Sequence, residues 1–185
     1  VPVCFTSAVT DAGVFELLSM METWLPCPLE GNPPEFYRPK DDSPVEIRMD
    51  PKRPVFAHAF KVMIDPFVAK MALFRLHQGT MTPESKVYVD DGRKNIKLGT
   101  LMTLNGKNNA PLSTAIPGDI CAVAKVDEIK LNSILHEGID ENSPRIRLAA
   151  RFPVPLAGVA IRAISRNDEQ RMADVLHKLI EEDPC

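Results

Sequence analysis

The first 28 residues carry two patterns of hydrophobic and polar positions, one typical of a strand and one of a helix. Residues 1–8 alternate apolar and small side chains, as a buried strand does. Thr10 and Asp11 then offer cap chemistry ahead of a helical run. In this run the apolar residues recur at the i, i+3, i+4, i+7 spacing of one helical face: Val14, Leu17, Leu18, Met21 and Leu25. Because Pro26 and Pro28 cannot continue a helix, we expect it to end near Trp24.

Residues 55 to 135 change to short apolar and β-branched runs separated by turn residues, the pattern of an all-β domain. Strands are expected at residues 54–62, 70–76, 86–89, 96–104 and 120–126. Turns are expected at 82–85, at the Asp-Asp-Gly of 90–92 and at the Asn-Gly of 105–106. Half a dozen or more short strands at this spacing favour a closed β-barrel or a sandwich. A barrel would leave no exposed sheet edge.

The last part of the chain changes its period again. Residues 153–162 are interpreted as a strand with prolines at its start, where a missing N–H is tolerated. Ser165 or Asn167 then caps a helix. Its buried stripe is expected to consist of Met172, Val175, Leu176 and Leu179. One strand and one helix cannot bury both their faces, so we expect the start of a small α/β domain in a piece of a longer polypeptide. We expect residues 153–185 to pack on a neighbour or to be poorly ordered.

Proline is concentrated between the first helix and the β region. The chain has 17 prolines in 185 residues, nearly twice the usual share of about 5%. Residues 26–54 hold much of this excess among charged residues, with little periodicity. We interpret this segment as an extended connector whose prolines limit the conformations that the chain samples.

Composition and charge are those of a globular protein. With 22 basic and 25 acidic side chains the net charge is −3, which excludes a uniformly basic nucleic-acid binder but allows a local basic face. No apolar run approaches the roughly 20 residues that a membrane span needs. The four cysteines lie far apart without a Cys-x-x-Cys pair, so we expect reduced thiols, no zinc site and a cytoplasmic protein.

The sequence offers no catalytic constellation. It lacks the Gly-x-x-x-x-Gly-Lys-Ser/Thr phosphate loop, the Gly-x-Ser-x-Gly elbow and the His-Glu-x-x-His pair. Asp65 and Asp119 lie at turns, where a carboxylate usually accepts backbone N–H bonds. The histidines occur singly and are expected to be surface or strand-flanking imidazoles: His58, His77, His136 and His177. We therefore expect no catalytic residue and no metal ligand in this chain.

Basic residues cluster at one place in the β region. Arg93, Lys94 and Lys97 lie within five positions, and Lys107 follows the next expected strand. If these strands pair as a hairpin, the four side chains form a patch at one end of the barrel. Phosphate contact is the functional interpretation, because Lys and Arg neutralise backbone charge without reading sequence. A solvated surface loop is the alternative.

Four groups of residues resemble, in the same order, motifs of translation elongation factor G. The Thr-Ser-Ala of 6–8 resembles the end of its G domain, with Ser7 and Ala8 as the guanine-contacting pair. Ala-Phe-Lys-Val at 59–62 with Asp-Pro-Phe-Val at 65–68 resembles the opening of its second domain. Pro-Gly-Asp-Ile at 117–120 resembles the Ala-Gly-Asp-Ile that precedes the last barrel strands. Phe-Pro-x-Pro at 152–155 and Leu-Ile-Glu-Glu-Asp-Pro at 179–184 resemble the start of the third domain.

This resemblance implies a mainly β fold, a translation-factor barrel flanked by a strand-helix remnant of an α/β G domain and by the strand-helix start of a ferredoxin-like α+β domain. The implied domains are residues 1–28 for the end of the GTPase domain, 29–54 for a linker, 55–145 for barrel domain II and 146–185 for an incomplete domain III. It implies a ribosome-dependent GTPase that acts in translocation, with the barrel docked on small-subunit rRNA and no membrane or DNA partner. GTP and magnesium belong to the full-length parent, and this piece is expected to hold neither.

Three other interpretations are compatible with the sequence. The segment Leu-Asn-Ser-Ile-Leu at 131–135 replaces the usual Thr-Gly-Asp-Thr-Leu of the family, as expected in a divergent paralogue. A ribosome-protection or recycling factor would use the same scaffold. A stand-alone module that grips RNA or a protein through the basic cluster is the alternative from a different class.

Overall fold

The computed structural model describes residues 2–28, 30–31, 34–38, 40–65, 69–106, 108–138, 145–146 and 155–183. The chain divides into two compact units, residues 1–33 and residues 34–185. Its elements are α1 (Val14–Trp24), β1 (Phe36–Tyr37), β2 (Phe56–Asp65), β3 (Ala69–Gln78), β4 (Lys86–Val89), β5 (Ile96–Lys97), β6 (Leu101–Asn105), β7 (Asn108–Pro111), β8 (Ile120–Ala124), β9 (Ile134–His136), β10 (Arg145–Ile146) and α2 (Arg166–Glu182).

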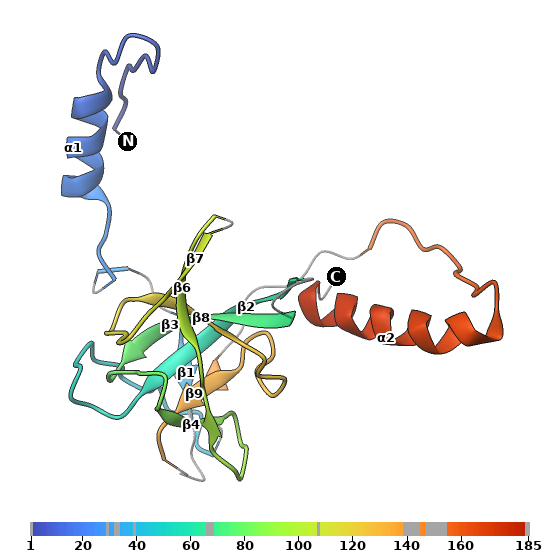
Figure 1. The fold of residues 1–185 in the computed structure, drawn as a ribbon. Coiled ribbons are helices and arrows are strands. Elements are labelled where there is room, and N and C mark those ends of the chain that lie inside the picture. The colour runs from blue at the N-terminus through green and yellow to red at the C-terminus, as the bar shows by residue number, and fades with distance from the viewer. Residues whose placement is uncertain are drawn as a thin grey trace. The chain divides into compact units, whose positions relative to one another are not determined.

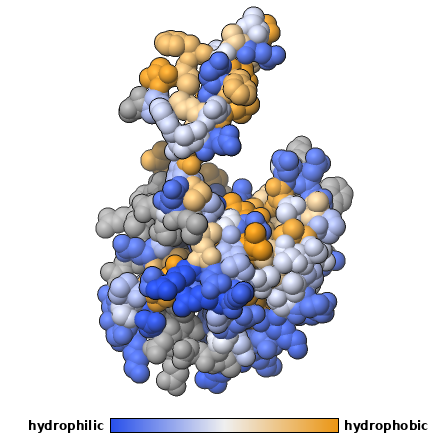
Figure 2. All heavy atoms as spheres, turned by 90° about the vertical axis from the view of Figure 1, so that its left-hand side faces the viewer, coloured by the Kyte–Doolittle hydropathy of each residue, from blue (hydrophilic) through white to orange (hydrophobic). Residues whose placement is uncertain are grey.

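The N-terminal unit is built around α1, which ends at Trp24 as its sequence predicts. The helix starts after Gly13, whose φ of 71° sets the entry, and neither Thr10 nor Asp11 caps it through a side chain. The expected strand at 1–8 is wrong: in the described residues 2–8 only Ser7 forms an isolated bridge, to Ala12. No residue of α1 is buried, and Figure 2 shows hydrophobic residues gathered on this unit.

The second unit contains the mainly β fold that the sequence predicts. Eight antiparallel strands form one curled sheet in the order β5-β4-β9-β2-β3-β8-β6-β7 (Figure 1). The long β2–β3 hairpin is its centre, with β9 on one side and β8 on the other. In the described part of the chain β5 and β7 are the two ends of this sheet, so it forms a half-barrel.

The strands differ from their expected bounds where the backbone turns left-handed. The strand expected at 96–104 is two strands, because Gly99 adopts φ 71° between β5 and β6. The strand expected at 120–126 ends at Ala124, before Lys125 with φ 62°. The short strands β7 and β9 were not expected, since neither carries a β-branched run that stands out from its neighbours.

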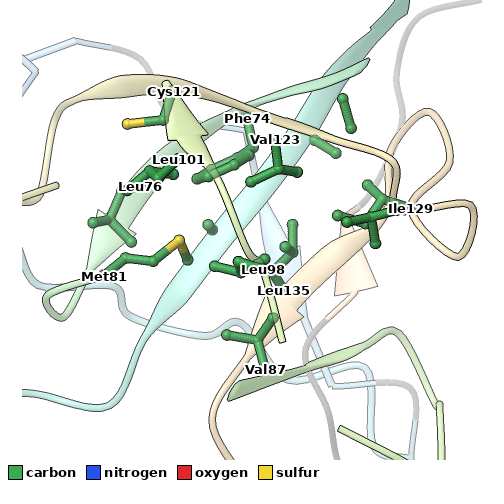
Figure 3. Packing of buried hydrophobic residues seen from close by; sticks show 14 of the residues in the cluster. Phe74, Leu76, Met81, Val87, Leu98, Leu101, Cys121, Val123, Ile129 and Leu135 are labelled. Atoms are coloured by element: carbon green, nitrogen blue, oxygen red, sulfur yellow. The ribbon is translucent and has the colours of Figure 1, made fainter. Parts of the chain in front are cut away.

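The core lies inside the curl of the sheet. Phe74 and Leu76 of β3 meet Leu101, Val123 and Leu135 from three other strands (Figure 3). All five are at most 1% exposed, so this contiguous cluster supplies the main hydrophobic stabilisation of the barrel.

The three cysteines in the described residues are free thiols. Cys4 and Cys27 are exposed, whereas Cys121 of β8 belongs to the barrel core. Burial, together with the nearby Asp119 carboxylate, raises the pKa of the Cys121 thiol to about 11. Cys121 is therefore a neutral core residue at physiological pH, and thiolate chemistry is not available to it.

Residues 34–54 lie against the barrel, although their sequence predicts an extended connector. Phe36 of β1 is only 4% exposed and packs edge-on against Phe56, with ring centroids 4.9 Å apart. Further along, the amide of Gln78 donates to the Pro54 carbonyl at 2.9 Å. The backbone N–H of Gly79 donates to the Asp50 carbonyl at 3.0 Å. Residues 34–54 thus cross the end of β3, and we call this segment the strap. The domain limits of 29–54 and 55–145 remain a prediction.

Under this strap lies a pair of histidines. The register shift between Phe56 and Ala57 leaves His77 as an extra residue in β3, and its ring packs 5.2 Å from that of Phe36. His58 lies next to it, 6.3 Å from Phe36 between ring centroids. The expectation of surface histidines is wrong for His58, His77 and His136, which are 6–8% exposed. Phe36, from a segment distant in the sequence, covers His58 and His77, and His136 stacks on Tyr88 of the neighbouring strand.

Burial sets the charge state of these two imidazoles. Desolvation, with smaller contributions from His58 and Arg75, lowers the pKa of His77 to about 4. The Nε2 of His77 has no hydrogen-bond partner in the described residues. Burial also lowers the pKa of His58, against the hydrogen bond between its Nε2 and Asn132 Oδ1 at 3.3 Å. Both rings are neutral at pH 7.

The C-terminal part contains the expected helix without the expected strand. α2 begins after Ser165, as predicted, but the Ser165 hydroxyl donates to the Asp168 carboxylate at 2.6 Å and caps no backbone N–H. Described residues 155–162 form no strand. The stripe expected to be buried is only partly covered: Met172 and Leu176 are half-buried, whereas Val175 and Leu179 are 48% and 53% exposed.

Candidate nucleic-acid interface

The β4–β5 hairpin carries most of the expected basic cluster. Lys86 pairs with Lys97 and Val87 with Ile96. Val87 is fully buried in the core, so the alternating side chains Lys86 and Lys97 face outward and are exposed. At the turn, the N–H of Gly92 donates to the Val89 carbonyl at 2.9 Å. A Cβ on Gly92 would lie 2.8 Å from that oxygen, so this tight turn needs a glycine.

The structure brings three of the four expected cations into one hairpin. Arg93 and Lys94 are exposed in the loop between β4 and β5. Across the described part of the chain, no hydrogen bond or ion pair involves either side chain. Lys97 lies on β5, at the base of the same hairpin. Lys107 lies outside the described residues.

Lys97 differs from Arg93 and Lys94 in having an acidic partner. The Lys97 Nζ forms an ion pair with Glu84 Oε2 at 2.6 Å, and both side chains are more than half exposed. Lys86, directly opposite, was not among the expected residues. Pairing the residues on the two sides of the predicted Asp-Asp-Gly turn in order would have placed Lys86 opposite Lys97. Like charges opposite each other in a sheet repel, and the carboxylate of Glu84 offsets this repulsion at Lys97.

Asp90 fixes the start of the turn to a distant segment. Its Oδ2 accepts from the Ser133 hydroxyl and its Oδ1 from the Ile134 N–H, both at 2.8 Å. Its backbone N–H donates to the Ile134 carbonyl at 2.8 Å. Figure 1 shows β4 beside β9, the strand that Ile134 begins. Sequence reasoning treated Asp90 only as a turn former, because Ser133 and Ile134 are more than 40 residues away.

His136 completes this attachment. Its ring stacks on Tyr88 of β4 with centroids 5.9 Å apart. Its Nε2 lies 2.8 Å from the Asp90 carbonyl oxygen. A carbonyl only accepts, so Nε2 carries the proton and donates it. All the polar groups of Asp90 are thus bonded within the chain, and the exposed cations beyond it are left to face solvent or a ligand.

The expected guanine-contacting pair lies in the N-terminal unit. The Ser7 N–H donates to the Ala12 carbonyl at 2.9 Å, while Ala8 is exposed in the turn between them. The Ser7 N–H is therefore occupied within this loop. A guanine contact by Ser7 and Ala8 stays a prediction.

The described residues offer neither a metal centre nor a membrane-spanning helix. They contain no group of three or more His, Cys, Asp or Glu side chains placed to hold a metal ion. Within the same residues, no helix combines the length and apolar character required to cross a bilayer. Asp119 is used as its turn predicts: its Oδ2 accepts from the Ile116 N–H at 2.9 Å. Among the described residues, the candidate site is therefore the group of exposed cations on the β4–β5 hairpin.

The β4–β5 hairpin lies in a segment that is similar to a known protein domain. Residues 54–138 match the family model described as elongation factor G domain 2. The chain is also similar to a crystal structure of a protein from Thermus thermophilus, with a TM-score of 0.67 and 29% sequence identity. That match covers 93% of this chain and 23% of the other, so this chain spans about a quarter of the length of the protein it matches.

Proposed function

We propose that this elongation-factor-G-like chain, whose residues 54–138 match the second domain of that factor, acts in translation as part of a ribosome-dependent GTPase. In this proposal the barrel docks on the small ribosomal subunit, and the exposed cations of the β4–β5 hairpin contact the phosphate backbone of its rRNA. The observation that carries the proposal is the fixed turn that presents Arg93 and Lys94 without intrachain partners in the described residues.

The hairpin has the properties that phosphate contact requires. Arg93, Lys94 and Lys86 are exposed, and none of the three side chains has an ion pair in the described residues. Each phosphate that such a cation neutralises releases condensed counterions, which makes affinity dependent on salt. The net charge of −3 makes non-specific binding over the whole surface weak, so affinity for RNA must come from a local patch.

Catalysis is assigned to residues outside this chain. GTP hydrolysis needs a phosphate loop and bound magnesium to neutralise the developing charge, and the 185 residues contain no Gly-x-x-x-x-Gly-Lys-Ser/Thr sequence. GTP and magnesium are therefore proposed for the full-length parent, with Ser7 and Ala8 as its guanine contacts. Translocation is the proposed role, and the cytoplasm is the compartment that goes with it.

Binding to small ribosomal subunits tests this proposal. We expect the double substitution Arg93→Ala with Lys94→Ala to weaken cosedimentation of the 185-residue chain with small ribosomal subunits purified from the organism that encodes the protein. Loss of two phosphate contacts should reduce the slope of log affinity against log salt by about two. Affinity is measured between low and physiological salt.

A matched control removes the same charge elsewhere. Lys52→Ala with Lys61→Ala also lowers the net charge by two, and both lysines are exposed outside the hairpin. We expect this control to keep the wild-type salt slope. Equal slopes for wild type and the Arg93/Lys94 variant would refute the docking proposal. Tight binding to any structured RNA, with no preference for subunits, would instead favour a stand-alone RNA module.

Glu84 competes with phosphate for Lys97. We expect Glu84→Gln to strengthen subunit binding several-fold, because Lys97 loses its intrachain counter-ion and the local charge rises by one. The gain should disappear in the background of Lys97→Ala. Unchanged affinity in Glu84→Gln would mean that Lys97 lies outside the interface, while Arg93 and Lys94 remain testable by themselves.

A further inference from the structure

Asp90 is an acidic residue at the centre of a cationic hairpin. By charge alone it opposes phosphate binding, since Arg93 and Lys94 follow within four positions. Yet its carboxylate is not free to meet a ligand, because both oxygens accept hydrogen bonds from Ser133 and Ile134. The residue also adopts φ 51°, a left-handed conformation that Asp and Asn tolerate better than most residues.

We infer that Asp90 is a positioning residue for phosphate recognition, which anchors the β4–β5 turn to residues 133–136 and thereby holds Arg93 and Lys94 ready for RNA. This inference rests on the docking proposed above. It assigns no contact with RNA to Asp90 itself. Its effect passes through the backbone, which the Asp90 N–H, carbonyl and carboxylate together tie to Ser133, Ile134 and His136.

The anchor acts by reducing the entropy lost on binding. A loop that must be ordered at the moment of contact loses affinity, whereas one already fixed in its bound conformation does not. Gly92 follows Asp90 by two residues and would leave the turn freely variable without such an attachment. Four hydrogen bonds at 2.8 Å from one residue are sufficient to restrict it.

Charge and positioning predict opposite results for the loss of this carboxylate. If Asp90 acted only through its charge, any neutral replacement would strengthen RNA binding. If Asp90 positions the turn, a replacement that removes the side-chain bonds weakens RNA binding despite the favourable change in charge. Asp90→Gly and Asp90→Asn separate the two effects, because both remove one negative charge and both accept the left-handed conformation.

The two variants differ in the side-chain bonds of the anchor, and Gly also adds backbone freedom at this position. Asn keeps an oxygen for the Ile134 N–H, and its amide donates to the Ser133 hydroxyl, whereas Gly keeps neither bond. We expect Asp90→Gly to weaken subunit binding about tenfold and to flatten its salt dependence, although all the cations remain. Asp90→Asn is expected to bind as tightly as wild type or more tightly. Amide hydrogen exchange at Gly92 should rise in Asp90→Gly alone.

A four-member cycle completes the test. It comprises wild type, Asp90→Gly, Arg93→Ala with Lys94→Ala, and the triple variant, each checked for unchanged thermal unfolding of the barrel. We expect Asp90→Gly to add no further loss once Arg93 and Lys94 are gone. If the Arg93/Lys94 variant weakens binding but Asp90→Gly does not, positioning is overturned and docking stands. If the Arg93/Lys94 variant itself leaves binding unchanged, both are overturned.

Discussion

Replacing Gly79 with alanine is expected to lower the free energy of unfolding of the barrel by about 3 kcal/mol or more. Gly79 follows β3 with φ 83°, and a Cβ there would lie 2.6 Å from the Val55 Cα and 2.8 Å from the Arg53 carbonyl oxygen. Both are backbone atoms, so no side-chain rotation relieves the contact. The Gly79 N–H bond to the Asp50 carbonyl would be lost with it.

Gly99 provides the matched control. Its φ is 71° and nothing lies within 4 Å of its Cβ position, so Gly99→Ala carries only the left-handed cost of about 1–2 kcal/mol. Urea denaturation followed by circular dichroism measures both variants. The single tryptophan, Trp24, lies in α1 and does not report on the barrel. Equal destabilisation of the two variants would show that the strap yields to the added methyl group.

Acidification from pH 7.5 to 4.5 is expected to lower the stability of the barrel by about 2 to 3 kcal/mol through His77 alone. Its pKa is about 4 in the folded protein, against the ordinary value of 6.5 that it regains on unfolding. The unfolded chain therefore binds more protons between these values. The contribution of neutral His77 to the free energy of unfolding is fully present above pH 6.5. It decreases as the pH falls toward 4 and does not change further below that pH. His58, whose pKa is also lowered, acts in the same direction.

Substitution at His77 identifies the source of this acid sensitivity. We expect His77→Leu to flatten stability between pH 6.5 and 4, because Leu fills the space under Phe36 without a protonation site or an unpaired nitrogen. His177→Leu changes an exposed histidine of α2 and should leave the pH profile as it is in wild type. Urea midpoints at half-unit pH steps measure both. An unaltered acid limb in His77→Leu would place the sensitivity elsewhere.

Much of the candidate site could be predicted from local pattern. The Asp-Asp-Gly turn predicts the hairpin, and the hairpin brings Arg93, Lys94 and Lys97 together, as the structure has them. Lys86 could have been found from the same register. Asp90 could not be assigned its anchoring role, because its partners Ser133 and Ile134 lie more than 40 residues away in the sequence. Side-chain bonds between distant segments leave no periodic trace in the sequence.

For the histidines too, the sequence predicts the position along the chain but not the burial. The sequence places His58 in one expected strand and His77 just after the next, but its alternation does not say that a further layer covers their outer face. Residues 34–54 form that layer, and proline-rich composition alone describes such a segment equally well as a free connector. Only the packing of Phe36 decides that these imidazoles are buried and uncharged.

The sequence by itself determined the class of the fold, the first and last helices and the location of the basic hairpin, because these follow from periods of two to four residues and from turn chemistry. The tertiary structure decided which cations are free, which acidic residue holds the turn and which histidines titrate abnormally. Those properties depend on burial and on hydrogen bonds between residues tens of positions apart, and such distances are set only when the sheet curls around its core.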